Sequence, residues 1–259
     1  MDDKKWQKHL GEEPYACGQE SVDRPYEEKV ALSARVLIFV PSEAKNVLVV
    51  GCGDGTEVKW LVDRGFDSRG VTRNQSEVIN AKKRYGVDIE VGDMHELPYP
   101  DKQFDCLVAK DVFEHAIAPT IALREFYRVL NDYGLLILTM PSMEWADEFY
   151  HHSVLTHKQM RIMFEKHSFE LLAGPGIKPK IPLKSPIIIP LGLKQGHIDV
   201  FIAKKLKYKP ADFAIDVQQI QQIPYVRFLK SIYKHCPAPI AKLFRGIYNQ
   251  LLMFKARFY

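Results

Sequence analysis

The chain has 259 residues, of which 46% are hydrophobic and 26% charged, a composition typical of ordinary globular proteins that excludes a disordered or membrane-spanning chain. This length accommodates one large α/β domain with an appendage. The net charge is +4, but residues 217–259 contain seven basic and no acidic residues, so the remainder is net negative and the two parts face different partners.

The N-terminal residues and the cysteines both indicate a reducing compartment. The chain is charged from its second residue and has no apolar leader, so no secretory signal is readable. Its cysteines are scattered, without a CxxC pair, which argues against a zinc site or a disulfide framework. They are Cys17, Cys52, Cys106 and Cys236. We therefore expect a cytoplasmic protein.

Periodicity predicts alternating helices and strands along most of the chain. The first helix is YEEKVALSARVLIFVP, ended by Pro41, and we expect it to pack over the binding face. The predicted strands are Asn46–Val50, Ser68–Thr72, Val87–Val91, Phe104–Ala109, Leu135–Met140, Ser168–Ala173 and His197–Lys204. The predicted helices between and after them are Thr56–Asp63, Ser76–Tyr85, Thr120–Leu130 and His157–His167. The first three are predicted to be stopped by Gly65, Gly86 and Gly134, respectively. Thr156 and Gln159 are placed to form a capping box at the start of the fourth.

Alternation of this kind predicts right-handed βαβ units and a mostly parallel sheet. Residues 175–195 contain five prolines and are predicted to form no regular element. They connect two strands that would otherwise form a hairpin, as an insertion at the sheet edge. Three parts are predicted: an N-terminal helical cap (1–41), the α/β domain (42–206) and a basic amphipathic helical extension (207–259).

The turn in NVLVVGCGDGTEVKWL, residues 46–61, indicates a ligand site. A strand that ends in glycine and leads into a helix brings backbone N–H groups and the positive helix end together. The spacing of Gly51, Gly53 and Gly55 has Thr56 where a dinucleotide site needs a third glycine or alanine, and it lacks the Gly-Lys-Ser/Thr of a phosphate loop. NAD, FAD, ATP and GTP are thus disfavoured, which leaves a nucleoside with an amino-acid tail or, alternatively, a tight turn without a ligand.

Two further stretches extend this pattern: EVGDMHELPYPDKQFDCLVAKDVFEHA (90–116) and REFYRVLNDYGLLILTMP (124–141). With the glycine turn they resemble the class I S-adenosylmethionine-dependent methyltransferases, within the small-molecule, methyltransferase type 11-like group. The resemblance covers about Asn46 to Lys204. It implies a Rossmann-like, doubly wound α/β fold with a seven-stranded, mostly parallel sheet, an antiparallel last strand and a C-terminal helical extension.

The resemblance implies S-adenosylmethionine as cofactor. The cofactor-binding residues that it implies are Gly51, Cys52, Gly53, Gly55, Thr72, Arg73, Asn74, Asp93, Met94 and Asp111. Asp93 would accept a hydrogen bond from the adenine amine while Met94 covers the ring. The alternative role of Asp93 is to cap a helix or a turn. Asp111 would lie beside the sulfonium.

The chain departs from the family at two positions. Val49 stands where an acid usually precedes the first glycine by two residues, and Thr72 stands where an acid usually binds both ribose hydroxyls. Asn74 and Gln75 would supply substitute polar contacts. These departures support an alternative function, that of a non-catalytic binding or scaffold protein with the same fold.

The main hypothesis is an enzyme that methylates a small or lipid-linked acceptor. His115 is the candidate catalytic base, its alternative role being packing or capping. Tyr150 and His152 are candidates for substrate contact. The spacing of His151, His152 and His157 matches no common ligand pattern, so no metal site is predicted. The motifs of nucleic-acid amino-methyltransferases and of protein arginine methyltransferases are absent, and a nucleic-acid substrate is therefore not expected.

Residues 217–259 read as two basic amphipathic helices, divided by Pro237 and Pro239. One interpretation is packing on the domain or on a second copy of the chain, which would form a homodimer. A second is binding to an anionic membrane surface, because aromatic and basic residues without acids suit lipid headgroups. RNA binding is a third. On the second interpretation, the cytoplasmic protein is peripherally attached to the membrane.

Overall fold

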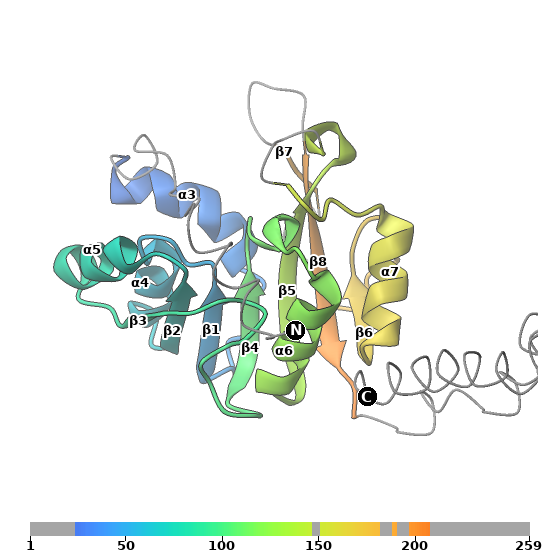
Figure 1. Cartoon of the computed structure of the whole chain (residues 1–259), viewed down its shortest axis with the longest axis horizontal. Coiled ribbons are helices and arrows are strands. Elements are labelled where there is room, and N and C mark those ends of the chain that lie inside the picture. Colours follow the sequence, from blue (N-terminus) through green and yellow to red (C-terminus); the bar gives the residue numbers. More distant parts are fainter. Residues whose placement is uncertain (1–23, 147–150, 182–187, 191–196, 208–259) are drawn as a thin grey trace, which may run out of the picture. The chain divides into compact units, whose positions relative to one another are not determined.

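A single mixed β-sheet organises the computed structural model shown in Figure 1. The structure describes residues 24–146, 151–181, 188–190 and 197–207. Its elements are α3 (Tyr26–Leu37), β1 (Asn46–Val50), α4 (Thr56–Val62), β2 (Asp67–Thr72), α5 (Gln75–Tyr85), β3 (Ile89–Val91), β4 (Phe104–Ala109), the 3₁₀ helix η1 (Phe113–His115), α6 (Pro119–Val129), β5 (Leu130–Pro141), the 3₁₀ helix η2 (Met143–Trp145), α7 (His157–Lys166), β6 (Phe169–Ala173), β7 (Ile188–Pro190) and β8 (His197–Lys205).

The strand order is β3-β2-β1-β4-β5-β8-β6. Strands β1 to β5 pair in parallel, whereas β8 runs antiparallel to both β5 and β6. The seven strands in this order confirm the predicted sheet with its antiparallel last strand, and the short strand β7 adds an eighth by pairing with β8. The order reverses between β1 and β4, and in open α/β sheets ligands bind beyond the carboxyl ends of the strands at such a reversal. The turn after β1 and the residues after β4 therefore occupy the expected binding crevice.

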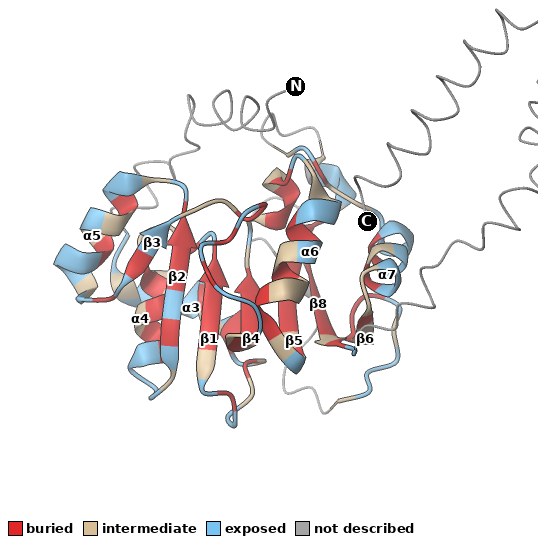
Figure 2. Ribbon diagram, turned by 60° about the horizontal axis from the view of Figure 1, so that its bottom comes forward, coloured by how far each residue is buried: buried red, intermediate tan, exposed pale blue. Residues whose placement is uncertain are grey.

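Two apolar cores lie on opposite faces of the sheet, because successive strand residues point to alternate sides. In β1, Leu48 and Val50 pack in one core, together with residues of α6 and α7. Val47 and Val49 pack in the other, together with residues of α3, α4 and α5. Figure 2 shows the central strands as almost continuously buried. Burial on both faces explains why these strands are apolar runs rather than alternating ones.

The helix ends follow the predicted local signals in most cases. Gly86 ends α5 in the left-handed conformation, with φ of 67°. Thr156 and Gln159 form the predicted capping box of α7. The first helix, α3, ends at Leu37, four residues before the predicted stop at Pro41.

Two predictions about regular elements were wrong. Gly134 does not close the helix before β5: α6 ends at Val129 and the chain passes directly into β5, where Leu130 pairs with Phe104. The left-handed residue there is Tyr133, with φ of 67°. The proline-rich segment also contains a regular element, because β7 pairs antiparallel with β8. Proline is tolerated there because Pro190 is the last residue of a three-residue strand.

None of the helices in the described ranges combines the length and the hydropathy needed to cross a membrane. The predicted amphipathic helices of residues 217–259 lie outside these ranges. So do Tyr150 and residues 1–23.

Candidate functional site

The glycine turn forms an ordered loop beyond the carboxyl end of β1. All three of its glycines have positive φ angles, 70° at Gly51, 50° at Gly53 and 83° at Gly55, a region that side chains disfavour. The amides of Gly51 and Cys52 both donate to the Val71 carbonyl, at 2.8 and 3.1 Å. These bonds tie the loop to the end of β2.

Gly51 also lies against the segment that follows β4. A Cβ atom built on Gly51 would lie 2.4 Å from Cγ2 of Val112, far inside van der Waals contact. The thiol of Cys52 is buried in the core beside the position where a Cβ of Gly70 would lie. The loop therefore offers backbone atoms, rather than the Cys52 side chain, for ligand contact.

The N-terminal helix α3 fixes the loop from one side. The Lys29 ammonium pairs with the Asp54 carboxylate, and the Ser33 hydroxyl donates to Oε1 of Glu57 at 2.6 Å. Asp54 in turn accepts from the amide and the hydroxyl of Thr56, the first residue of α4, at 3.2 and 2.7 Å. These contacts place α3 beside the glycine loop and the start of α4.

A buried carboxylate lies at the end of β2, although the strand itself ends in Thr72. The Thr72 hydroxyl donates to Oε2 of Glu77, whose side chain is buried in the first turn of α5. Asn74 caps the same helix by accepting from the Ser76 amide at 2.9 Å. The sequence reasoning missed Glu77, because an acid in the first turn of a helix is usually a solvated partner of the helix dipole.

Asp93, after β3, caps a turn and contacts Arg73. Its Oδ1 accepts from the His95 amide at 2.8 Å and pairs with His95 Nδ1, and its Oδ2 lies 3.8 Å from Nε of Arg73. Burial raises the pKa of Asp93, but the hydrogen bonds from His95 and the Arg73 charge outweigh it, so the net pKa is lowered. Asp93 is thus an ionised cap. Met94 is buried in the core with Leu97.

Asp111, after β4, adopts a strained backbone with φ of 50°. Its amide donates to the Thr139 hydroxyl at 2.8 Å, and its carboxylate accepts from Lys110 at 2.6 Å. Burial lowers the pKa of Lys110, but Asp111 and Glu57 outweigh this and raise it overall. The contacts of Lys110 thus connect the end of β4 to the start of α4.

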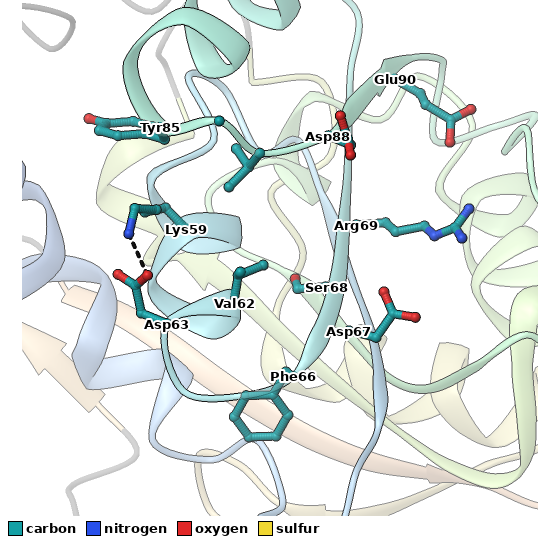
Figure 3. Close-up of a pocket in the computed structure, with 12 residues that line it drawn as sticks. Lys59, Val62, Asp63, Phe66, Asp67, Ser68, Arg69, Tyr85, Asp88 and Glu90 are labelled. Carbon is teal, nitrogen blue, oxygen red and sulfur yellow. Dashed lines mark hydrogen bonds and ion pairs between the residues drawn. The ribbon is translucent and has the colours of Figure 1, made fainter.

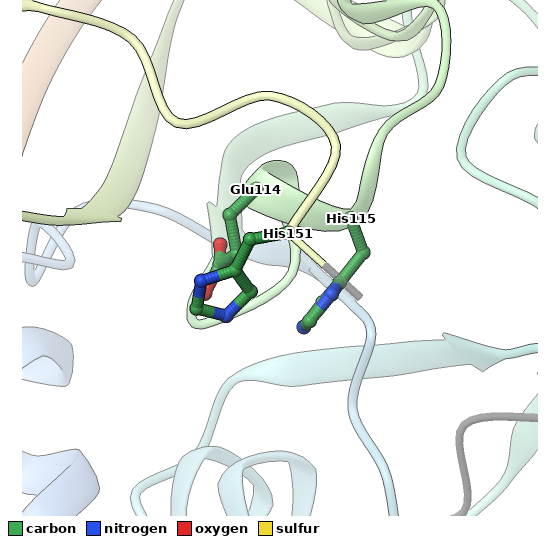
Figure 4. Close-up of side chains that lie close together, drawn as sticks. All are labelled: Glu114, His115 and His151. Carbon is green, nitrogen blue, oxygen red and sulfur yellow. The ribbon is translucent and has the colours of Figure 1, made fainter. Parts of the chain in front are cut away.

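The next residues bring a carboxyl and two imidazoles together (Figure 4). Glu114, His115 and His151 each offer one possible ligand atom, and these three atoms all lie within 4.8 Å of one another. Burial raises the pKa of Glu114, and the negative charge of the nearby Asp111 raises it further, to about 8. His152 is exposed, and Nε2 of His157 contacts Oδ2 of Asp199 at 2.5 Å instead of joining the cluster.

A separate pocket of about 560 Å³ lies at the opposite end of the sheet (Figure 3). It is lined by the first residues of β2, Asp67, Ser68 and Arg69, and by Tyr85 at the end of α5. Because Thr72 marks the carboxyl end of β2, this pocket is at the amino end. Ligand sites of open α/β sheets lie at carboxyl ends, so we do not assign the pocket to the candidate site.

The sequence is similar to those of known methyltransferases. Residues 48–138 match a family described as "Methyltransferase domain". The chain is 31% identical over 99 residues to a probable S-adenosylmethionine-dependent methyltransferase of Mycolicibacterium smegmatis, which is 38% of each protein. It is 30% identical over 102 residues to a fatty-acid O-methyltransferase of the same species, which is 38% of this chain and 37% of that protein. The matches thus span less than two fifths of these curated relatives.

The fold is also similar to solved structures. One is a methyltransferase in complex with the Trm112 methyltransferase activator of Haloferax volcanii. The TM-score is 0.55 at 17% identity, with 69% of this chain and 89% of that one covered. This likeness concerns the fold alone.

Proposed function

We propose that this chain, whose residues 48–138 form a methyltransferase domain of the class I S-adenosylmethionine-dependent family, methylates a small or lipid-linked acceptor. The observation that carries the proposal is the ordered glycine loop at the sheet reversal, next to the carboxylate of Glu77. Because the curated relatives are matched over less than two fifths of their length, activity, acceptor and partners are all part of this proposal.

The residues fit S-adenosylmethionine by the chemistry of their groups. The left-handed backbone of residues 51–55 would receive the methionine and ribose portions, and the Glu77 carboxylate beside Thr72 would accept the ribose hydroxyl protons. Asp93 would accept a hydrogen bond from the adenine amine, through the carboxylate lone pairs that the contacts with His95 do not use. Asp111 would lie beside the sulfonium. When bound, the cofactor supplies an electrophilic methyl group.

The departure at Val49 is compatible with such a site. Val49 is 1% exposed and packs in the core beneath α3 and α4, where an unpaired carboxylate would be costly. In this chain Asp54 holds the loop, through its contacts with Lys29 and Thr56. An acid at Val49 is therefore not needed to order the glycine turn.

The acceptor would enter beside the carboxyl end of β4. His115 in η1 is partly exposed there, and its neutral imidazole would remove the proton of a hydroxyl or amine acceptor. Exposed His152 follows in the neighbouring segment, and Tyr150 completes the proposed contacts. The fatty-acid O-methyltransferase among the relatives supports an apolar acceptor class.

The function is tested by titrating the full chain calorimetrically with S-adenosylhomocysteine, then assaying methyl transfer to fatty acids, prenylated phenols and, for contrast, tRNA. We expect one cofactor site with micromolar affinity and transfer to a fatty acid or prenylated phenol. No binding at high micromolar ligand would overturn the enzyme proposal. Binding without transfer to any acceptor would favour the non-catalytic alternative.

We also propose that residues 217–259 attach the enzyme to anionic membranes, because their seven cations and several aromatics have no acidic neighbours in the sequence. Deletion of the residues after Leu206 is expected to abolish co-sedimentation with phosphatidylserine vesicles while leaving S-adenosylhomocysteine binding intact. Neutral phosphatidylcholine vesicles are the control. Equal sedimentation of the truncated and full-length chains would contradict the proposal.

A further inference from the structure

We propose that Glu114, His115 and His151 bind one divalent transition-metal ion, such as Zn²⁺, at the carboxyl end of β4. The three residues offer one carboxylate oxygen and two imidazole nitrogens, all within 4.8 Å of one another. Zinc sites hold such ligands at about 2.0–2.2 Å from the ion, which places them roughly 3.3 Å apart.

The buried carboxyl of Glu114 is the independent observation that indicates a cation. The residue is 4% exposed, and its Oε2 has no hydrogen-bond partner among the described residues. A buried polar atom without a partner costs free energy, and most native proteins avoid it. Figure 4 shows this carboxyl beside the His151 ring, with the His115 side chain nearby. A metal ion between them would give Oε2 the partner that it lacks.

The protein holds the two halves of the cluster together by main-chain contacts. His151 is 36 residues from His115 in sequence, but the amide of Ser153 donates to the Glu114 carbonyl at 2.8 Å, and the Ser153 hydroxyl donates to the Ala116 carbonyl. Ser153 is buried, as are Phe113 and Ala116 on either side of the ligand pair. The short distances therefore follow from a packed junction rather than from surface side chains that happen to meet.

The ligand set favours a transition metal over Mg²⁺ or Ca²⁺. Imidazole nitrogens suit Zn²⁺, Fe²⁺, Co²⁺ and Ni²⁺, whereas Mg²⁺ and Ca²⁺ prefer oxygen donors. Three protein ligands leave a fourth position open, which is the arrangement of catalytic rather than structural zinc sites. In the metal-bound chain His115 would be a ligand rather than the base, and the ion would instead offer a Lewis acid to an acceptor oxygen, a role that rests on the proposed function. The binding of the ion does not rest on it.

The test uses the full chain, stripped of metals with a chelator and titrated with Co²⁺ under visible absorption, followed by displacement with Zn²⁺. We expect one equivalent to bind with the bands of four- or five-coordinate cobalt. Glu114→Gln and His151→Ala should each weaken the affinity at least about tenfold. Exposed His152→Ala is the matched control, with unchanged affinity, because it alters an adjacent histidine outside the cluster.

Two readouts keep the result unambiguous. Thermal melts and S-adenosylhomocysteine titrations on the same samples show whether each variant is folded and whether the proposed cofactor site is present, independently of the metal. Absence of a stoichiometric cobalt spectrum in the wild-type chain would overturn the metal site. The metal site would also be overturned if Glu114→Gln and His151→Ala both bound cobalt as tightly as the wild type. Binding would then lie elsewhere, because the chain has nine histidines.

Discussion

Replacing Gly51 with alanine is expected to weaken S-adenosylhomocysteine binding at least about a hundredfold. The new Cβ would lie 2.4 Å from Cγ2 and 2.6 Å from Cβ of Val112, so the loop and the segment after β4 must move apart. Alanine also disfavours the φ of 70°, by about 1–2 kcal/mol. Both effects distort the backbone that is proposed to receive the cofactor. Calorimetric titration measures the loss.

Gly65→Ala is the matched control for this experiment. Gly65 also has a positive φ, 87°, but a Cβ there would have no atom within 4 Å. The control variant therefore carries the conformational penalty without the clash, and we expect its affinity to stay within about twofold of the wild type. Adding Val112→Gly to Gly51→Ala removes the clashing side chain and should restore part of the affinity. Tight binding by Gly51→Ala alone would refute the proposed role of the loop.

Replacing Glu77 with glutamine is expected to lower the affinity for S-adenosylhomocysteine by about 10- to 100-fold. A hydrogen bond to a charged group contributes about 1.5–3 kcal/mol, and the carboxylate is the proposed acceptor of the ribose hydroxyls. Glutamine has nearly the same shape and can still accept from the Thr72 hydroxyl, so the packing of α5 against β2 is kept. The reduced affinity therefore reports on the carboxylate. Isothermal titration calorimetry gives the two dissociation constants.

A ligand without the ribose hydroxyls tests whether the effect arises at the ribose. The wild-type chain should bind a 2′,3′-dideoxy analogue of S-adenosylhomocysteine much more weakly than the parent, while Glu77→Gln should discriminate little between the two. Glu28→Gln, an exposed glutamate in the first turn of α3, is the matched control and should behave as the wild type. If Glu77→Gln still prefers the parent ligand as strongly as the wild type, the carboxylate does not contact the ribose.

Local signals in the sequence predicted much of the fold. Strands β1 and β4 have the predicted bounds, because each is an apolar run that is buried on both faces. The capping box at Thr156 was read from two residues three positions apart, and the structure confirms it. The prediction for Gly134 was wrong because strand pairing, not the local helix-stop signal, decides where α6 ends: Leu130 already pairs with Phe104 of β4.

The sequence by itself thus determined the order of helices and strands along the chain and the position of the glycine turn, because periodicity and the spacing of glycines depend on neighbouring residues alone. Only the tertiary structure decided which way side chains point and which distant groups meet. It buried Glu77 beneath Thr72, and it brought His151 to Glu114. Such contacts depend on how helices and loops pack on the sheet, and the spacing of residues in a single chain does not encode them locally.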